Sequence, residues 1–116
     1  MKDQETLDGE ELLWRRVHKY HLLENGKVSS AAFSGDEMSV DVASVQKEKS
    51  KTLVDSVGVA EFEARIAQAL NQETIADPIP ENPAHALVIG KKTKAIKRKL
   101  RDSARFTSRN AILKEK

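Results

Sequence analysis

The chain has 116 residues, of which 39% are apolar and 33% are charged, and it contains no cysteine. This length predicts one domain at most, and the missing cysteines exclude a disulfide framework, a thiolate zinc site and a cysteine nucleophile. The apolar run over residues 86–89 is far shorter than the roughly 20 residues that cross a bilayer, and five of the first twelve residues are acidic. We therefore expect a cytoplasmic protein with neither a secretory leader nor a membrane contact.

The charges are unevenly distributed along the chain. Residues 91–116 hold 11 Lys and Arg against 2 acids, whereas residues 1–90 hold 9 against 16. This split predicts a basic C-terminal arm that meets either nucleic acid or an acidic protein surface.

The first third of the chain carries hairpin signals. Residues 1–11 are polar and acidic, and we interpret them as a flexible lead-in. Asn25-Gly26 lies between two strand-like segments, and this pair is typical of a tight hairpin turn because both residues tolerate a positive φ. We therefore expect two or three hairpin-linked strands over residues 12–43.

Two segments in the middle of the chain have apolar residues at regular spacings. Met38, Val40 and Val42 alternate with polar or small residues, which predicts a strand over residues 38–43 with one buried face. Residues 59–70 fit both a helical stripe and a strand alternation. Their Ala, Glu, Arg and Gln content favours a helix, and a strand remains the alternative.

The last third begins with a stiff connector. All three prolines fall in residues 77–83, and each fixes φ and removes a hydrogen-bond donor. The apolar run at residues 85–89 then predicts a strand, and Thr93 is a suitable N-cap for a helix over residues 93–105. We interpret residues 106–116 as a basic, flexible tail.

These elements predict an α+β fold. We expect a small mixed or antiparallel sheet packed by one or two helices, with a basic C-terminal helix and a single domain over residues 12–105.

Three motifs resemble a family of small uncharacterised bacterial proteins. They are VSSAAF at residues 28–33, SVD at residues 39–41 and NPAHA at residues 82–86. The resemblance covers residues 12–105 and implies a bacterial, cytoplasmic protein. No activity and no functional residue comes with it.

His85 is the strongest candidate for chemistry. An imidazole after a proline-rich turn can serve as acid, base or ligand, although a histidine that only fixes the connector is the simpler interpretation. Asp41 could orient His85, and Ser29 or Ser30 could be the hydroxyl on which they act. The chain contains neither a His-Glu-x-x-His metal motif nor a phosphate-binding glycine loop, and we expect no metal and no cofactor.

Basic residues provide two candidate phosphate contacts. In the helix over residues 93–105, one face gathers Lys94, Lys97, Arg98, Arg101 and Arg105 opposite an apolar seam, and such a face can neutralise phosphates. It can equally be a solvated surface. Arg15 and Arg16 follow Trp14, and this group could bind phosphate or bases; the alternative is a core tryptophan with solvated arginines on an edge strand.

Two functional hypotheses follow. The first is a small non-enzymatic binding or accessory module that docks a protein partner and touches nucleic acid through the basic helix. The second is a minimal enzyme or toxin-like component that uses His85, Asp41 and Ser29 or Ser30. Convergence of these side chains in one pocket would favour the enzyme.

Overall fold

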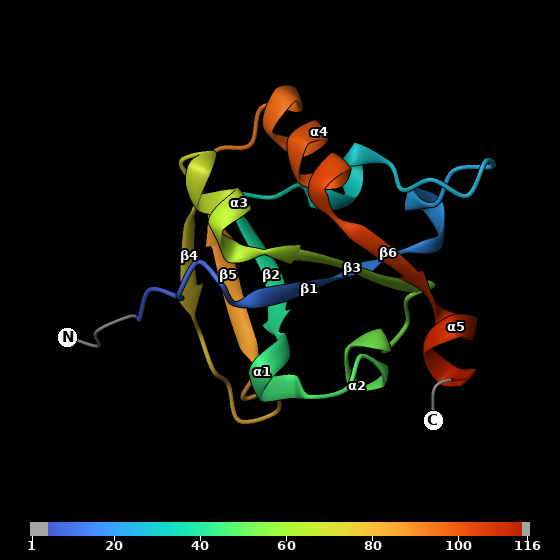
Figure 1. The fold of residues 1–116 in the computed structure, drawn as a ribbon, viewed down its shortest axis with the longest axis horizontal. Helices are drawn as coiled ribbons and strands as arrows, with labels where there is room; N and C mark the ends of the chain where they lie inside the picture. Colours follow the sequence, from blue (N-terminus) through green and yellow to red (C-terminus); the bar gives the residue numbers. More distant parts are fainter. Residues whose placement is uncertain (1–4, 115–116) are drawn as a thin grey trace.

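A computed structural model describes residues 5–114 of the chain. Within these residues, six strands form one sheet in the order β4-β5-β2-β1-β3-β6, and every pairing is antiparallel (Figure 1). The strands are β1 (Leu12–Val17), β2 (Glu37–Val42), β3 (Gly58–Glu63), β4 (Glu73–Ala76), β5 (His85–Ile89) and β6 (Arg105–Ser108). The predicted α+β fold is confirmed.

The helices are short. They are α1 (Ala43–Gln46), α2 (Ser50–Leu53), α3 (Ala64–Ala69), α4 (Lys94–Ser103) and α5 (Arg109–Lys114), with 3-10 turns η1 (Lys19–His21) and η2 (Ser30–Phe33). Among residues 5–114, no helix has the length and apolar character needed to span a membrane.

One face of the sheet carries the main hydrophobic core. Met38 and Val40 of β2 point to this face, as their alternation predicts, and pack with Leu13 of β1. The helices α3 and α4 and the turn η2 lie over them (Figure 1). Phe33 of η2 meets Phe62 of β3 edge to face, with ring centroids 6.2 Å apart. This face therefore holds most of the buried apolar surface.

A smaller cluster lies on the opposite face. Trp14 of β1 and Val59 of β3 pack there with Leu53 of α2 and Ile112 of α5. The Trp14 indole nitrogen donates to Glu61 Oε2 at 2.8 Å. The strand β1 is thus central, between β2 and β3, rather than at the edge we expected.

The segment over residues 59–70, whose pattern fits both a strand and a helix, forms first a strand and then a helix. Its first part continues β3 to Glu63, and α3 begins at Ala64. The preference for helix was therefore right only for the second part. Strand pairing with β1 and β6 overrides the helix propensity of the first part.

The predicted hairpin is a turn without long strands. Gly26 has a φ of 83°, and Leu23 N donates to Lys27 O at 2.8 Å, so the chain does reverse at Asn25-Gly26. Around it only an isolated bridge joins Leu22 to Val28. The next residues form η2 instead of a strand, because Ser29 Oγ caps the turn by accepting from Ala31 N.

The segments that we predicted as a flexible lead-in and tail contact the rest of the fold, as far as the described residues extend. Leu7 N donates to Thr74 O at 2.8 Å, and this bond ties the lead-in to β4. Beyond α4 the chain forms β6 and α5, and Ile112 is buried. Residues 5–11 and 106–114, in the predicted lead-in and tail, therefore make contacts with the rest of the fold. Residues 1–4 and 115–116, also included in those predictions, lie outside the described part.

Gly58 allows β6 to approach β3 closely. A Cβ atom at this position would meet the Phe106 ring and the backbone oxygen of Thr107. Only glycine leaves that space free, so Phe106 packs over β3 and against the main core.

Candidate functional site

The basic helix α4 is anchored by a narrow apolar seam. Thr93 Oγ1 accepts from Ile96 N at 3.3 Å, which confirms the predicted N-cap. Leu100 is fully buried in the main core, and Ile96 packs against the same core. The seam fixes the rotation of the helix and therefore the direction of its charged side chains.

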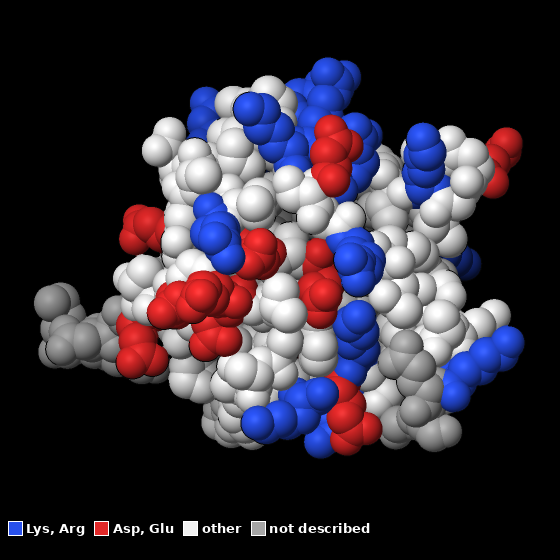
Figure 2. All heavy atoms as spheres, viewed as in Figure 1, with Lys and Arg blue, Asp and Glu red and all other residues white. Residues whose placement is uncertain are grey.

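Four cations form one stripe along α4, with spacings that place them on neighbouring turns. We call this set the basic stripe; its members are Lys94, Lys97, Arg98 and Arg101. Arg101 Nε lies 2.9 Å from Asp102 Oδ1. The other three side chains have no hydrogen-bond or ion-pair partner among residues 5–114. Lys and Arg side chains gather over α4 at the top of the molecule in Figure 2.

Arg105 does not belong to this stripe. The helix ends at Ser103, Ala104 is extended, and Arg105 begins β6 directly opposite Glu61 of β3. The prediction of a helix over residues 93–105 was therefore two residues too long. Strand pairing with β3 turns Arg105 toward the other face of the sheet.

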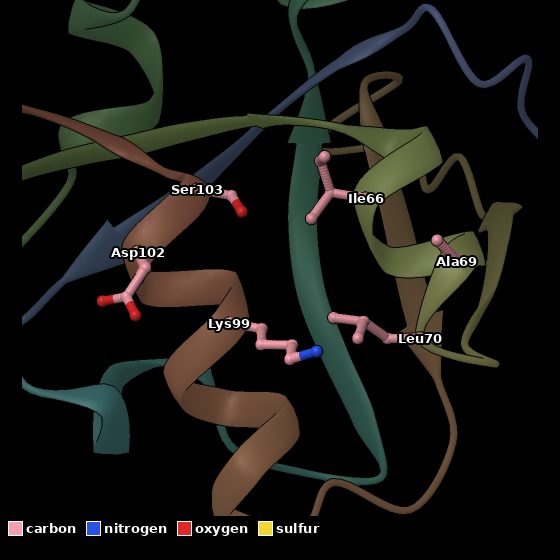
Figure 3. A pocket seen from close by; sticks show the side chains of 6 residues that line it. All are labelled: Ile66, Ala69, Leu70, Lys99, Asp102 and Ser103. Atoms are coloured by element: carbon pink, nitrogen blue, oxygen red, sulfur yellow. The ribbon is translucent and has the colours of Figure 1, made fainter.

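A shallow apolar groove lies along the other flank of α4, between it and α3. It has a volume of about 230 Å³, and Ile66 and Leu70 supply its apolar wall. Figure 3 shows the Lys99 side chain extending across the groove toward Leu70 and the Asp102 carboxylate turning away from it. The groove gives α4 an apolar border on the flank opposite the basic stripe.

His85 lies on the uncovered part of the second sheet face. Its Nδ1 is 3.1 Å from Asp77 Oδ2 and 3.0 Å from Asp77 O, and its Nε2 is 3.2 Å from Ser39 Oγ. Because both neighbours of Nδ1 are acceptors, Nδ1 donates to them, and in the neutral imidazole Nε2 then accepts from the Ser39 hydroxyl. The residues that position His85 are therefore Asp77 and Ser39.

Asp41 is the cross-strand partner of His85 but makes other contacts. Its carboxylate accepts from Thr52 Oγ1 at 2.7 Å, from Gln46 Nε2 at 2.9 Å and from Asn82 Nδ2 at 2.7 Å. Asp41 and His85 share one face of the sheet, but each is hydrogen-bonded to other side chains. The prediction that Asp41 orients His85 is therefore wrong.

Ser29 and Ser30 lie on the opposite side of the sheet. They belong to the start of η2, which packs beneath α4 through Ala32 and Phe33 in the main core. The predicted catalytic set of His85, Asp41, Ser29 and Ser30 therefore does not converge.

The tryptophan and its two arginines have three separate roles. Trp14 is buried and cannot stack on bases. Arg15 Nε donates to Ala32 O and its Nη1 donates to Ser39 O, both at 2.9 Å, and burial followed by the charge of Arg16 lowers the pKa of Arg15. Arg16 is half-buried and has no acceptor among residues 5–114.

Asp77 and Ser39 were missed by sequence reasoning, whereas Arg16 was among the candidate phosphate contacts. The signal for Ser39 was present, because it shares a strand face with Asp41 in the motif that we had singled out. The signal for Asp77 was its place before the first proline of the connector. Neither could be assigned without the register between β2 and β5.

The described residues contain no group of three or more His, Asp or Glu side chains that could hold a metal ion. No family model, curated protein or solved structure matches the chain.

Proposed function

We propose that the protein is a small non-enzymatic binding module that contacts the phosphates of a nucleic acid through the basic stripe on α4. The observation that carries this proposal is that Lys94, Lys97 and Arg98 stand on an anchored helix and have no hydrogen-bond or ion-pair partner among residues 5–114. Because these cations have no partner to give up, phosphates can replace the water around them without breaking an intramolecular contact.

The linear arrangement of the stripe favours a polyanion over an acidic protein. From Lys94 to Arg101 the stripe extends along α4 for about 10 Å, at 1.5 Å for each residue of helix. A nucleic-acid backbone offers regularly spaced charges over such a length, whereas carboxylates on a protein surface are irregularly placed.

Base-specific contacts are not part of the proposal. Phe106, the aromatic residue nearest to α4 in sequence, is held against the main core and over Gly58. Because the Phe106 ring is packed in this way and cannot stack on bases, the stripe supports binding to the backbone with little dependence on sequence. A bacterial, cytoplasmic setting belongs to the same proposal and rests on the three motifs of residues 28–33, 39–41 and 82–86.

Salt dependence tests the proposal. Affinity for a labelled single-stranded or duplex oligonucleotide should fall linearly on a double-logarithmic plot against salt, with a slope of about −2.8 to −3.6 for four contacts. The double variant Arg98→Gln, Arg101→Gln should flatten the slope by about one and a half units. Fluorescence anisotropy measures both values.

The matched control is the double variant Lys47→Gln, Lys114→Gln. It removes the same charge from the C-terminal end of α1 and from α5, both of which lie away from α4 (Figure 1). Its slope should equal that of the wild type. Failure of the wild type to bind at about 50 mM salt, or an equal loss in both double variants, would overturn the proposal.

A hydrolytic function is the second candidate, and one observation favours it. Ser39, His85 and Asp77 form a chain of hydrogen bonds in which imidazole could take the hydroxyl proton. It ranks second because Ser39 does not line the pocket that His85 borders. A fluorophosphonate probe tests this candidate, since labelling of Ser39 that disappears in the His85→Ala variant would support an enzyme.

A further inference from the structure

The uncovered end of the second sheet face holds a pocket with a volume of about 520 Å³. It lies between the proline connector on one side and the segment of α1 and α2 on the other, at the end of the molecule far from α4 (Figure 1). The lining includes Arg16, Asp41, Gln46, Lys51, Asn82 and His85. Small-molecule sites commonly have volumes of about 300–1,000 Å³, so this pocket has a suitable size.

One wall of the pocket is built around the buried carboxylate of Asp41, which is only 3% exposed. Its three donors come from three different segments: Gln46 from the end of α1, Thr52 from α2 and Asn82 from the connector. These hydrogen bonds tie the two sides of the pocket to β2. The pocket is therefore preorganised rather than formed by loosely placed loops.

A second wall is held by His85. Its two ring nitrogens are engaged by Asp77 at the start of the connector and by Ser39 on β2. The imidazole therefore has a fixed orientation on the pocket side of β5, and the connector cannot move away without breaking these bonds.

The guanidinium of Arg16 is a cation of the pocket that has no partner among the described residues. It is half-buried among these polar side chains, and no acceptor within residues 5–114 reaches it. Asp41, the buried acid of the pocket, already accepts three hydrogen bonds. A guanidinium offers five donors in a planar fork that matches a phosphate or a carboxylate.

We propose that this pocket binds a small organic oxyanion, a phosphate- or carboxylate-bearing molecule whose anionic group lies on Arg16. Lys51, exposed at the rim and 3.9 Å from Glu48, adds a second positive charge. Glu81 is the exposed acid of the lining. Together with Asp41 it favours a ligand that carries hydrogen-bond donors beside its anionic group. The site is separate from the basic stripe.

Nuclear magnetic resonance titration of the ¹⁵N-labelled protein tests this site, with inorganic phosphate and acetate as probes at constant ionic strength. Phosphate should produce saturating shifts at Arg16 Nε and at the backbone amides of Asp41 and Asn82. Saturation by acetate as well would indicate carboxylate ligands, and saturation by phosphate alone would indicate phosphate ligands.

Variants assign the anion to Arg16. The Arg16→Gln variant should bind phosphate about tenfold more weakly or worse, since one charge-assisted hydrogen bond corresponds to that factor. Arg16→Lys keeps the charge but not the fork and should be intermediate. The control is Arg65→Gln, which removes an exposed arginine paired with Glu63 at 2.7 Å and should not change the titration.

The outcomes also separate this site from the nucleic-acid surface. Pocket shifts should persist in the double variant Arg98→Gln, Arg101→Gln even if that variant loses nucleic acid. Shifts without saturation, shifts spread over all basic side chains, or saturation unchanged in a folded Arg16→Gln variant would overturn the proposal.

Discussion

The Nδ1 atom of His85 lies 3.1 Å from Oδ2 of Asp77, so the first residue of the proline connector is bound to the first residue of β5. The connector leaves the sheet at Asp77 and returns to it at His85, where Asp77 N also donates to His85 O at 2.9 Å. These two hydrogen bonds between Asp77 and His85 close the connector into a loop and fix its position beside Asp41.

Removal of the His85 side chain should loosen this closure. The His85→Ala variant should lose about 1–3 kcal/mol in the free energy of unfolding, because its half-buried partners Asp77 and Ser39 lose their hydrogen bonds. Urea denaturation followed by circular dichroism measures the loss. The control is His18→Ala, at an exposed position, which should stay within about 0.5 kcal/mol of the wild type. Equal stability of both variants would show that the His85 contacts do not support the fold.

A substitution at Gly58 should test the close pairing of β6 with β3. The Gly58→Ala variant should be destabilised by about 1–3 kcal/mol, since the new methyl group must displace the Phe106 ring or the backbone of Thr107. Part of the cost should disappear in the Phe106→Leu background, which makes a double-mutant cycle informative. A neutral Gly58→Ala would mean that β6 does not lie against β3 as described.

The elements that sequence predicted best are those with a local signal. The alternation of Met38, Val40 and Val42 specifies β2, and Thr93 specifies the start of α4. The strand β6 could not be predicted in the same way. Phe106 is a single apolar residue among polar neighbours, and the segment becomes a strand only because β3 offers a free edge.

The candidate site was predicted only in part, for a related reason. His85 and Asp41 were correctly placed on adjoining strands, but their hydrogen-bond partners depend on contacts between distant segments. Asp77 reaches His85 because the connector reverses, and Asn82 reaches Asp41 from the same connector. Such pairings depend on strand register and loop path, and neither has a local sequence signal.

Acidification should weaken the fold through His21. Burial, followed by the positive charges of His18 and Arg15, lowers the pKa of His21 below its ordinary value of 6.5. Between the two pKa values the unfolded chain binds more protons than the folded chain. Stability should therefore be retained above pH 6.5 and fall as the pH drops from there through the folded-state pKa.

The His21→Gln variant should show a shallower loss of stability on acidification. His18→Gln should have a smaller effect in the same direction, because it removes only one cause of the shift. Thermal denaturation midpoints measured between about pH 5 and 8 give both slopes. A steeper acid loss in His21→Gln than in the wild type would contradict the assignment.

Lys92 should contribute to stability rather than to phosphate binding, although it belongs to the basic third of the sequence. Its side chain is buried, and its Nζ donates to Gly35 O at 2.7 Å, to Val88 O at 2.8 Å and to Gly90 O at 3.1 Å. Burial lowers its pKa. The ammonium thus joins the loop before β2 to the end of β5.

The Lys92→Met variant should therefore lose about 1–3 kcal/mol in the free energy of unfolding, because three carbonyl groups lose their donor while the new side chain keeps a similar length. Its oligonucleotide affinity, measured well below the melting temperature, should equal that of the wild type. The matched control is Lys91→Met at the exposed neighbouring position, whose stability should stay within about 0.5 kcal/mol. A Lys92→Met variant that is fully stable, or one that loses oligonucleotide affinity while still folded, would show that this lysine acts at the surface instead.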